Sequence, residues 1–203
     1  MLEFLRPTYQ ALLRPVAAVL THLGVSANAV SVAGTLGVVA ASVWWLGRGH
    51  FLAGSALVAL FLLGDGLDGA VARLTGGGSR FGAFLDSTLD RVADAAVFGS
   101  LAWWFATSSH LPGLAAAVMS LVAALLVSYA RARAEVEGWR ADAGPAERTD
   151  RLVICLVGTG LVGLGAPVEV AVGALWLVAA LSILTVARRI RAAAAQAGVA
   201  TPG

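Results

Sequence analysis

Charged residues make up only 13% of this 203-residue chain and hydrophobic residues 59%, with a mean hydropathy of +0.83. Because a soluble domain is about one quarter charged, this composition excludes a soluble globular protein and indicates a membrane protein. The net charge is only +2 and no basic face is interleaved with aromatic residues, so the sequence does not indicate a nucleic-acid-binding protein.

The first 22 residues carry leucines and a valine together with Arg6 and Arg14, and they lack a long apolar core. This pattern predicts an amphipathic helix that lies in the membrane interface rather than a cleavable signal peptide. The apolar positions of this helix are Leu2, Leu5, Leu12, Leu13, Val16 and Leu20.

Six charge-poor runs follow, at residues 29–46, 51–64, 95–109, 111–130, 152–168 and 170–187. A helix rises ~1.5 Å per residue, so about 20 residues cross a ~30 Å hydrocarbon core. The runs at 51–64 and 95–109 reach this length only if their helices continue into the polar segment between them. We therefore predict an all-α integral membrane protein with six transmembrane helices. It forms a single membrane domain over 1–203, with the interfacial helix at 1–22, a six-helix bundle at 23–191 and a C-terminal tail at 192–203.

The basic residues orient these helices. All 14 are arginine, and 13 of them fall before the first predicted helix, between the second and third, between the fourth and fifth, or after the sixth. Arg48 is the one arginine in a loop that is predicted on the other side of the membrane. By the positive-inside rule, both termini are predicted to be cytoplasmic.

Four aspartates interrupt the hydrophobic pattern in a fixed arrangement. Residues 65–90 fit D-x2-D-G-x2-A-R-x8-G-x3-D-x3-D at every specified position, with the aspartates at Asp65, Asp68, Asp86 and Asp90. Ionisable residues inside a membrane are expensive and indicate a functional site. The alternative is that each carboxylate lies at a helix end in the headgroup region and pairs with a nearby arginine.

Helical spacing places these aspartates on two faces. Asp65 and Asp68 share one helix face with the small residues Gly69 and Ala72, whereas Asp86 and Asp90 lie one turn apart on the next helix. Three glycines at 76–78 provide a short turn, so we expect the two helices to be antiparallel neighbours whose carboxylates converge. Asp94 continues the second row at a deeper position, where metal binding and hydrogen bonding to a ligand residue are both open.

The distance from the opposite surface gives the depth of the motif. Asp65 is 17 residues from Arg48, roughly 25 Å along a helix, and Asp90 is 18 residues from Ser108, roughly 27 Å. The motif should therefore lie near the cytoplasmic interface. Four converging carboxylates would repel one another without cations, and oxygen ligands of this kind suit two Mg²⁺ ions, with Mn²⁺ as the alternative. Small residues nearby would let a phosphorylated ligand approach the backbone, and Arg73 could bind its phosphate.

This segment resembles the signature of the CDP-alcohol phosphotransferases, and the six predicted helices agree with that family along nearly the whole chain. The resemblance implies a homodimeric phospholipid-synthesising enzyme of the bacterial inner (plasma) membrane, with a cytoplasmic active site. It also implies a metal-dependent reaction in which an alcohol displaces CMP from CDP-diacylglycerol.

The same resemblance assigns roles to residues. It implies that Asp65, Asp68, Asp86 and Asp90 bind metal and that Asp90 also accepts the proton of the acceptor hydroxyl. The residues that it implies for CDP-diacylglycerol binding are Asn28, Ala29, Val30, Ser31, Gly69, Ala72, Arg73, Ser79 and Gly82. Ser26-Ala27 and Ser31 stand where the family has Thr-Pro and Thr, so we expect a less rigid loop at residues 26–31.

The acceptor alcohol must be chosen by the second half of the chain. Residues 128–152 resemble the branch of the family that makes phosphatidylinositol phosphate, whose acceptor is 1D-myo-inositol 3-phosphate, also named L-myo-inositol 1-phosphate. By this resemblance, the residues that bind the acceptor phosphate are Arg131, Arg148, Arg151 and Arg189. Arginines at cytoplasmic helix ends are also ordinary topology signals, and this alternative applies to each of them.

Two other functions remain open from the sequence. A phosphatidylglycerol-phosphate synthase would use glycerol 3-phosphate and would need the same kind of arginine-lined phosphate site. A divalent-cation transporter could also use four aspartates, but transporter sites lie near the midplane between repeats. The chain shows no internal repeat, and its motif is expected near one surface.

Overall fold

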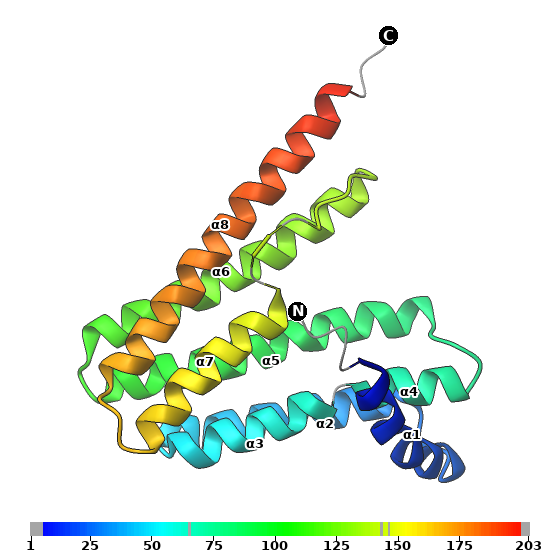
Figure 1. The fold of residues 1–203 in the computed structure, drawn as a ribbon, viewed down its shortest axis with the longest axis horizontal. Coiled ribbons are helices and arrows are strands. Elements are labelled where there is room, and N and C mark those ends of the chain that lie inside the picture. The colour runs from blue at the N-terminus through cyan, green and yellow to red at the C-terminus, as the bar shows by residue number, and fades with distance from the viewer. Residues whose placement is uncertain (1–5, 65, 143, 146, 200–203) are drawn as a thin grey trace.

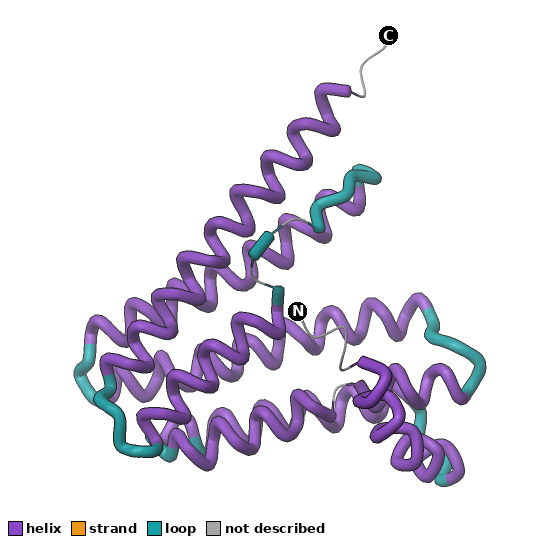
Figure 2. The backbone as a smooth tube through the Cα atoms, viewed as in Figure 1, coloured by secondary structure: helices purple, strands orange, loops and turns teal. Residues whose placement is uncertain are grey.

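The computed structural model describes residues 6–64, 66–142, 144–145 and 147–199. Every regular element in these residues is a helix, and none of them is a strand (Figure 2). In chain order the elements are α1 (Arg6–His22), α2 (Ala27–Trp44), the short 3-10 helix η2 (Leu46–Arg48), α3 (Phe51–Gly64), α4 (Gly66–Leu74), α5 (Arg80–Thr107), α6 (Leu111–Val136), α7 (Arg148–Gly163) and α8 (Glu169–Val199). The predicted all-α class is confirmed.

Within the described residues, four segments are long and apolar enough to cross a membrane: Ala27–Arg48, Phe51–Leu74, Leu111–Val136 and Glu169–Gly198. The candidate segment Phe51–Leu74 spans α3 and α4, so it includes the run at 51–64 and part of the aspartate motif. The other two predicted spans fall on α5, which is 28 residues long but carries several charges, and on α7, which has 16 residues.

Capping side chains fix where several helices begin. Ser26 caps α2, with its Oγ accepting a hydrogen bond from the Ala29 amide at 3.2 Å. Ser79 caps α5 in the same way, accepting from the Gly82 amide at 2.9 Å. Each cap satisfies an amide that the helix itself leaves unpaired. Gly77, with a φ of 108°, lies in the turn that joins α4 to α5 and adopts a backbone conformation that glycine tolerates best.

Helix α2 packs against α3, α4 and α5, and so it contacts both of the helices that carry the described aspartates. These two helices were expected to be antiparallel neighbours, and their main packing partners lie elsewhere: α1 and α2 for α4, and α2 and α6 for α5. The expected antiparallel course is present, because α4 and α5 run in opposite directions from the turn that joins them (Figure 1), and α2 supplies a packing surface for both.

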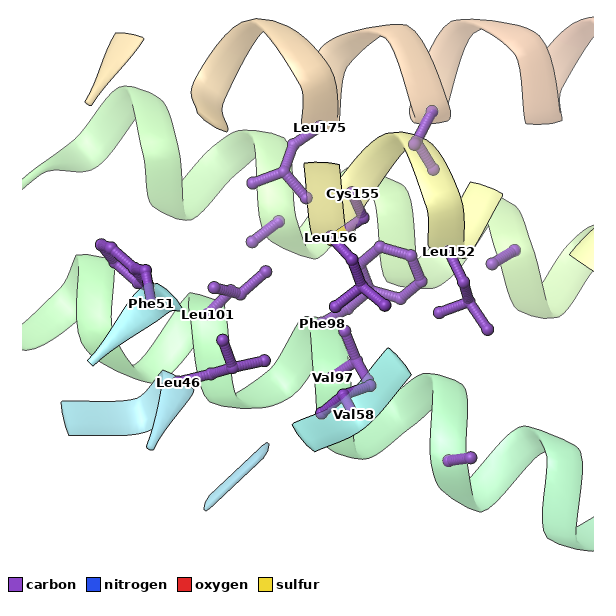
Figure 3. Packing of buried hydrophobic residues seen from close by; sticks show 14 of the residues in the cluster. Leu46, Phe51, Val58, Val97, Phe98, Leu101, Leu152, Cys155, Leu156 and Leu175 are labelled. Atoms are coloured by element: carbon purple, nitrogen blue, oxygen red, sulfur yellow. The ribbon is translucent and has the colours of Figure 1, made fainter. Parts of the chain in front are cut away.

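The main hydrophobic core is centred on α5 (Figure 3). Phe98, Leu101 and Phe105 are fully buried there, and Leu152 and Cys155 of α7 belong to the same cluster. Polar side chains also join helices inside this apolar bundle. Ser120 Oγ of α6, for example, donates to the Leu175 carbonyl of α8 at 2.7 Å, a type of bond that is favoured where water is excluded.

The long helices α6 and α8 lie side by side and rise away from α5 at the end opposite the α5–α6 and α7–α8 connections (Figure 1). Helix α8 continues to Val199, past the boundary that we predicted at residue 191. Its alanine-rich end favours helix. In addition, Gln196 exchanges two hydrogen bonds with the Arg140 backbone, at 2.8 and 2.9 Å.

Helix α1 packs against α4, and Ala17 meets Ala70 and Val71 in a small second core. The described part of the predicted interfacial segment is thus helical. Its placement in the membrane interface stays a prediction.

Candidate active site

A cavity of about 410 Å³ opens between α2, α4 and the start of α5. The sequence predicted eight of the residues that line it: Asn28, Ser31, Asp68, Gly69, Ala72, Ser79, Gly82 and Asp86. Residues from three helices, up to 58 positions apart in the chain, therefore meet where a nucleotide-diphosphate group was expected. The lining does not include Ala29, Val30 or Arg73.

The side chain of Asp68 is held in place inside this cavity. Its Oδ2 accepts a hydrogen bond from Ser31 Oγ at 2.5 Å, and its Oδ1 accepts one from the Gly69 amide at 2.5 Å. Ser31 thus joins the 28–31 stretch directly to the aspartate motif. The Ser26 cap at the start of α2 also gives this stretch an anchor that we had not predicted.

Little room is left beside Gly82 in the wall of this cavity. A Cβ atom at Gly82 would lie 3.1 Å from Ser79 Oγ and 3.2 Å from Asn28 Oδ1. These distances are tight, so an added methyl group would require the Ser79 and Asn28 side chains to shift by a few tenths of an ångström. At Gly69, a Cβ atom would lie 3.5 Å from Nη1 of Arg73, which places that guanidinium over the glycine although it does not line the cavity.

A larger cavity, of about 1060 Å³, opens between α5, α6, α7 and α8. Its lining includes both aspartates of the motif that lie on α5 and all four arginines that were predicted to bind the acceptor phosphate: Asp86, Asp90, Arg131, Arg148, Arg151 and Arg189. Ala83 and Asp86 line this cavity and the smaller one, so the two adjoin at Asp86.

Two of these arginines are almost completely buried. Arg151 is 2% exposed and Arg189 is 6% exposed, whereas the side chain of Arg131 is 55% exposed. Nη1 of Arg189 donates to the Val127 carbonyl of α6 at 2.7 Å, and Nε of Arg131 donates to Glu135 at 2.9 Å. Burying a guanidinium is costly, so positive charge in this wall points to a binding role rather than to a topology signal alone.

Asp90 takes part in an ionic network. Its Oδ1 lies 2.6 Å from Nη1 of Arg148, and its Oδ2 lies 3.5 Å from Nη2 of Arg91. Arg148 comes from the start of α7, so this pair joins α5 to α7 across the wall of the larger cavity. Asp90, which was predicted to accept the proton of the acceptor hydroxyl, thus lies beside Arg148, which was predicted to bind the acceptor phosphate.

The aspartates are suitable ligands for a divalent metal, because hard carboxylate oxygens are what Mg²⁺ and Mn²⁺ prefer. Asp68, Asp86 and Asp90 line the two adjoining cavities, and Asp65 lies outside the described residues. Among the residues that the structure describes, no group of three or more His, Cys, Asp or Glu side chains is close enough to hold a metal ion. The donor chemistry therefore fits a metal, and the described aspartates are distributed along the junction of the cavities.

Sequence reasoning missed some residues of these cavities. Arg91 lines the larger cavity and pairs with Asp90, although adjacent residues on a helix do not share a face. Thr75 and Gly77 also line the smaller cavity; Gly77 was treated only as part of a turn, and Thr75 was not considered. The position of Asp94 one turn beyond Asp90 indicated that this residue lies near the site, but its partners on α7 could not be inferred from spacing.

Comparison with known proteins agrees with this geometry. Residues 24–186 match the family model described as CDP-alcohol phosphatidyltransferase. The chain is 40% identical over 187 residues to a phosphatidylinositol phosphate synthase of Corynebacterium glutamicum, a match that covers 91% of this chain and 85% of the relative. It is 42% identical over 209 residues to the enzyme of that name from Streptomyces avermitilis, with 98% and 86% covered.

Solved structures of the Mycobacterium tuberculosis phosphatidylinositol phosphate synthase have the same fold. The structure with CDP-DAG bound is 38% identical with a TM-score of 0.87, and the match covers 90% of this chain and 94% of that chain. The complex with manganese and citrate is 37% identical with a TM-score of 0.85, covering 89% and 88%. Because the family model spans most of the sequence and the relatives exceed one third identity, the chain belongs to the CDP-alcohol phosphatidyltransferase family.

Proposed function

We propose that this protein is a phosphatidylinositol phosphate synthase, which transfers the phosphatidyl group of CDP-diacylglycerol to L-myo-inositol 1-phosphate and releases CMP. The observation that carries the proposal is the larger cavity, where Asp86 and Asp90 of α5 face four arginines drawn from α6, α7 and α8. A phosphorylated acceptor requires fixed positive charge near the reacting centre, and this wall provides it.

The two cavities divide the substrates between them. The smaller one, lined by small residues and by Asp68, accommodates the diphosphate of the CDP-lipid, to which the backbone can approach closely. The larger one accommodates the acceptor, whose phosphate is bound by arginines such as Arg151 and Arg189. The reaction then takes place near Asp86, which lines both cavities.

In the chemical step, a hydroxyl oxygen of the acceptor attacks the phosphorus of the phosphatidyl group. The new P–O bond forms as the bond to the bridging oxygen breaks, and CMP leaves with that electron pair. Asp90 accepts the hydroxyl proton, because an alcohol is a weak nucleophile near neutral pH. Arg148, beside Asp90, binds the acceptor phosphate and so brings the hydroxyl within reach of the base.

Two Mg²⁺ ions, or Mn²⁺, held by Asp65, Asp68, Asp86 and Asp90 would neutralise the diphosphate and the leaving phosphate. The manganese complex of the tuberculosis relative supports divalent-metal use in this family. Ser31 then orients Asp68 for this role through its hydrogen bond.

The proposal includes a location in the bacterial plasma membrane. We infer that six spans cross the membrane, two of them on α5 and α7, with both termini and both cavities on the cytoplasmic side, where soluble acceptor and CMP exchange freely. The distribution of arginines supports this orientation. A homodimer, as the family resemblance implies, would cover part of the apolar surface.

The test is CMP release by purified protein in detergent, with CDP-diacylglycerol, Mg²⁺ and one acceptor at a time: L-myo-inositol 1-phosphate, free inositol or glycerol 3-phosphate. We expect release with inositol 1-phosphate alone, abolished by EDTA and restored by Mg²⁺. Release with glycerol 3-phosphate alone would overturn the acceptor and identify a phosphatidylglycerol-phosphate synthase. Absence of release with every acceptor, from a folded sample that binds CDP-diacylglycerol, would overturn the proposed reaction.

A further inference from the structure

Asp94 of α5 is a buried carboxylate that the proposed reaction does not use. It lies one helical turn beyond Asp90, is 1% exposed, and does not line the larger cavity. It also lies outside the four aspartates of the motif. Because a buried charge is unfavourable unless it is compensated, its neighbours indicate what it does.

Those neighbours are three guanidinium groups. Oδ1 of Asp94 accepts a hydrogen bond from Nε of Arg148 at 3.2 Å. Oδ2 lies 3.7 Å from Nε of Arg91 and 3.8 Å from Nη2 of Arg151, which are ion-pair distances longer than a hydrogen bond. One carboxylate on α5 therefore lies among cations from α5 and from the start of α7.

The contact with Arg148 is directional. A guanidinium is planar and rigid, so fixing Nε determines where its two Nη groups point. Nε of Arg148 is bound by Asp94, and Nη1 reaches Oδ1 of Asp90 at 2.6 Å in the cavity wall. Asp94 thus sets the orientation of a side chain that lines the cavity while remaining behind it.

Asp94 also offsets repulsion between like charges. Arg148 and Arg151 are one turn apart on α7, and both line the larger cavity. Without a nearby anion, their mutual repulsion would favour separation of the two guanidiniums. A single buried anion behind them allows both to face the same ligand.

We propose that Asp94 is a positioning residue for the acceptor: it holds Arg148 and Arg151 in the arrangement that binds the phosphate of a phosphorylated polyol. This inference rests on the proposed function, in which those two arginines bind the acceptor phosphate. It assigns Asp94 to acceptor binding and not to metal binding, because the residue contacts arginines behind the cavity wall.

The experiment compares Asp94→Asn with the wild-type protein by initial rates of CMP release, varying the acceptor and CDP-diacylglycerol separately. Loss of one charge-assisted contact predicts a KM for the acceptor raised by about tenfold. The KM for CDP-diacylglycerol and the Mg²⁺ concentration at half-maximal rate should not change. Asp94→Glu keeps the charge, so its KM for the acceptor should lie between those of the wild-type protein and Asp94→Asn. If Asp94→Asn does not fold, Asp94→Glu is compared with the wild-type protein instead, and a raised acceptor KM is again expected.

A double-mutant cycle separates positioning from a general structural role. In an Arg148→Gln background, Asp94→Asn should change the acceptor KM much less than it does in the wild-type background, because the guanidinium through which Asp94 mainly acts is absent. Equal effects in both backgrounds, or a change in Mg²⁺ dependence with an unchanged acceptor KM, would overturn the proposal. If the wild-type protein uses glycerol 3-phosphate, that acceptor's KM becomes the measure, so failure of the inositol assignment remains distinguishable from failure of this inference.

Discussion

The two cavities are built differently, although they meet at Asp86. The smaller one is formed by residues 26–31 and by the motif segment, and its walls are mainly glycine, alanine and serine. The larger one is formed by four helices and contains five arginines, counting Arg91. In the function that we propose, close backbone approach binds the nucleotide-lipid, whereas fixed side-chain charge binds the acceptor.

The difference extends to how each side is stabilised. Hydrogen bonds from short side chains at helix ends, such as the Ser79 cap, stabilise the walls of the smaller cavity. The larger cavity depends on ion pairs between helices and on the Arg189 contact with the α6 backbone. Substitutions should therefore affect the donor or the acceptor selectively, except at residues that act in the chemical step itself.

The largest effect should come from Asp90→Asn, because Asp90 acts in the proposed chemical step and not in the binding of one substrate alone. Loss of the general base predicts a fall in kcat of about 10²- to 10⁴-fold, with CDP-diacylglycerol binding retained. Rates of CMP release and a lipid-binding assay check this. Glu137→Gln, at an exposed ion pair with Arg133, is the control and should behave as wild type. A normal kcat for Asp90→Asn would assign the base to another residue.

Next in size is Arg151→Gln on the acceptor side. The loss of a charge-assisted phosphate contact predicts an acceptor KM higher by about 10- to 100-fold, with the KM for CDP-diacylglycerol unchanged. Arg133→Gln removes an arginine that does not line either cavity, and it should leave both KM values unchanged. Equal weakening of both substrates by Arg151→Gln would contradict the division between the cavities.

On the donor side, Ser31→Ala removes the hydrogen bond to Asp68. We expect about a tenfold rise in the Mg²⁺ concentration at half-maximal rate, because a contact to a charged group is lost. The acceptor KM should stay constant. Thr107→Ala is the matched control, because the Thr107 hydroxyl donates to backbone carbonyls of its own helix, far along α5 from the motif. An unchanged metal dependence in Ser31→Ala would show that Asp68 does not need this partner.

The smallest effect should follow Gly82→Ala. The added methyl group needs shifts of a few tenths of an ångström in Ser79 and Asn28, so we expect a KM for CDP-diacylglycerol that rises only severalfold. Gly99→Ala is the control in the same helix, because a Cβ atom added there would meet no atom within 4 Å, and neither KM should change. A larger effect of Gly82→Ala on the acceptor than on the lipid would reverse the assignment of the two cavities.

Much of the smaller cavity could be predicted from local sequence. Helical periodicity places Asp68, Gly69 and Ala72 on one face and puts Asp86 and Asp90 one turn apart, whatever surrounds them. The glycines after α4 indicate a turn. What spacing could not supply was the contribution of α2, which packs against both α4 and α5 and lines the cavity with them.

The larger cavity required the tertiary structure. Arg131 and Arg189 are 58 residues apart, and no local pattern places them in one wall; the packing of α6 along α8 does so. Likewise, spacing left metal binding and hydrogen bonding equally open for Asp94, and only the approach of α7 supplied its partners. The sequence by itself therefore determined the class of protein, the family and the face of each helix that carries charge. The tertiary structure decided which charges meet, because ion pairs between helices depend on how distant segments pack and not on the period of any one helix.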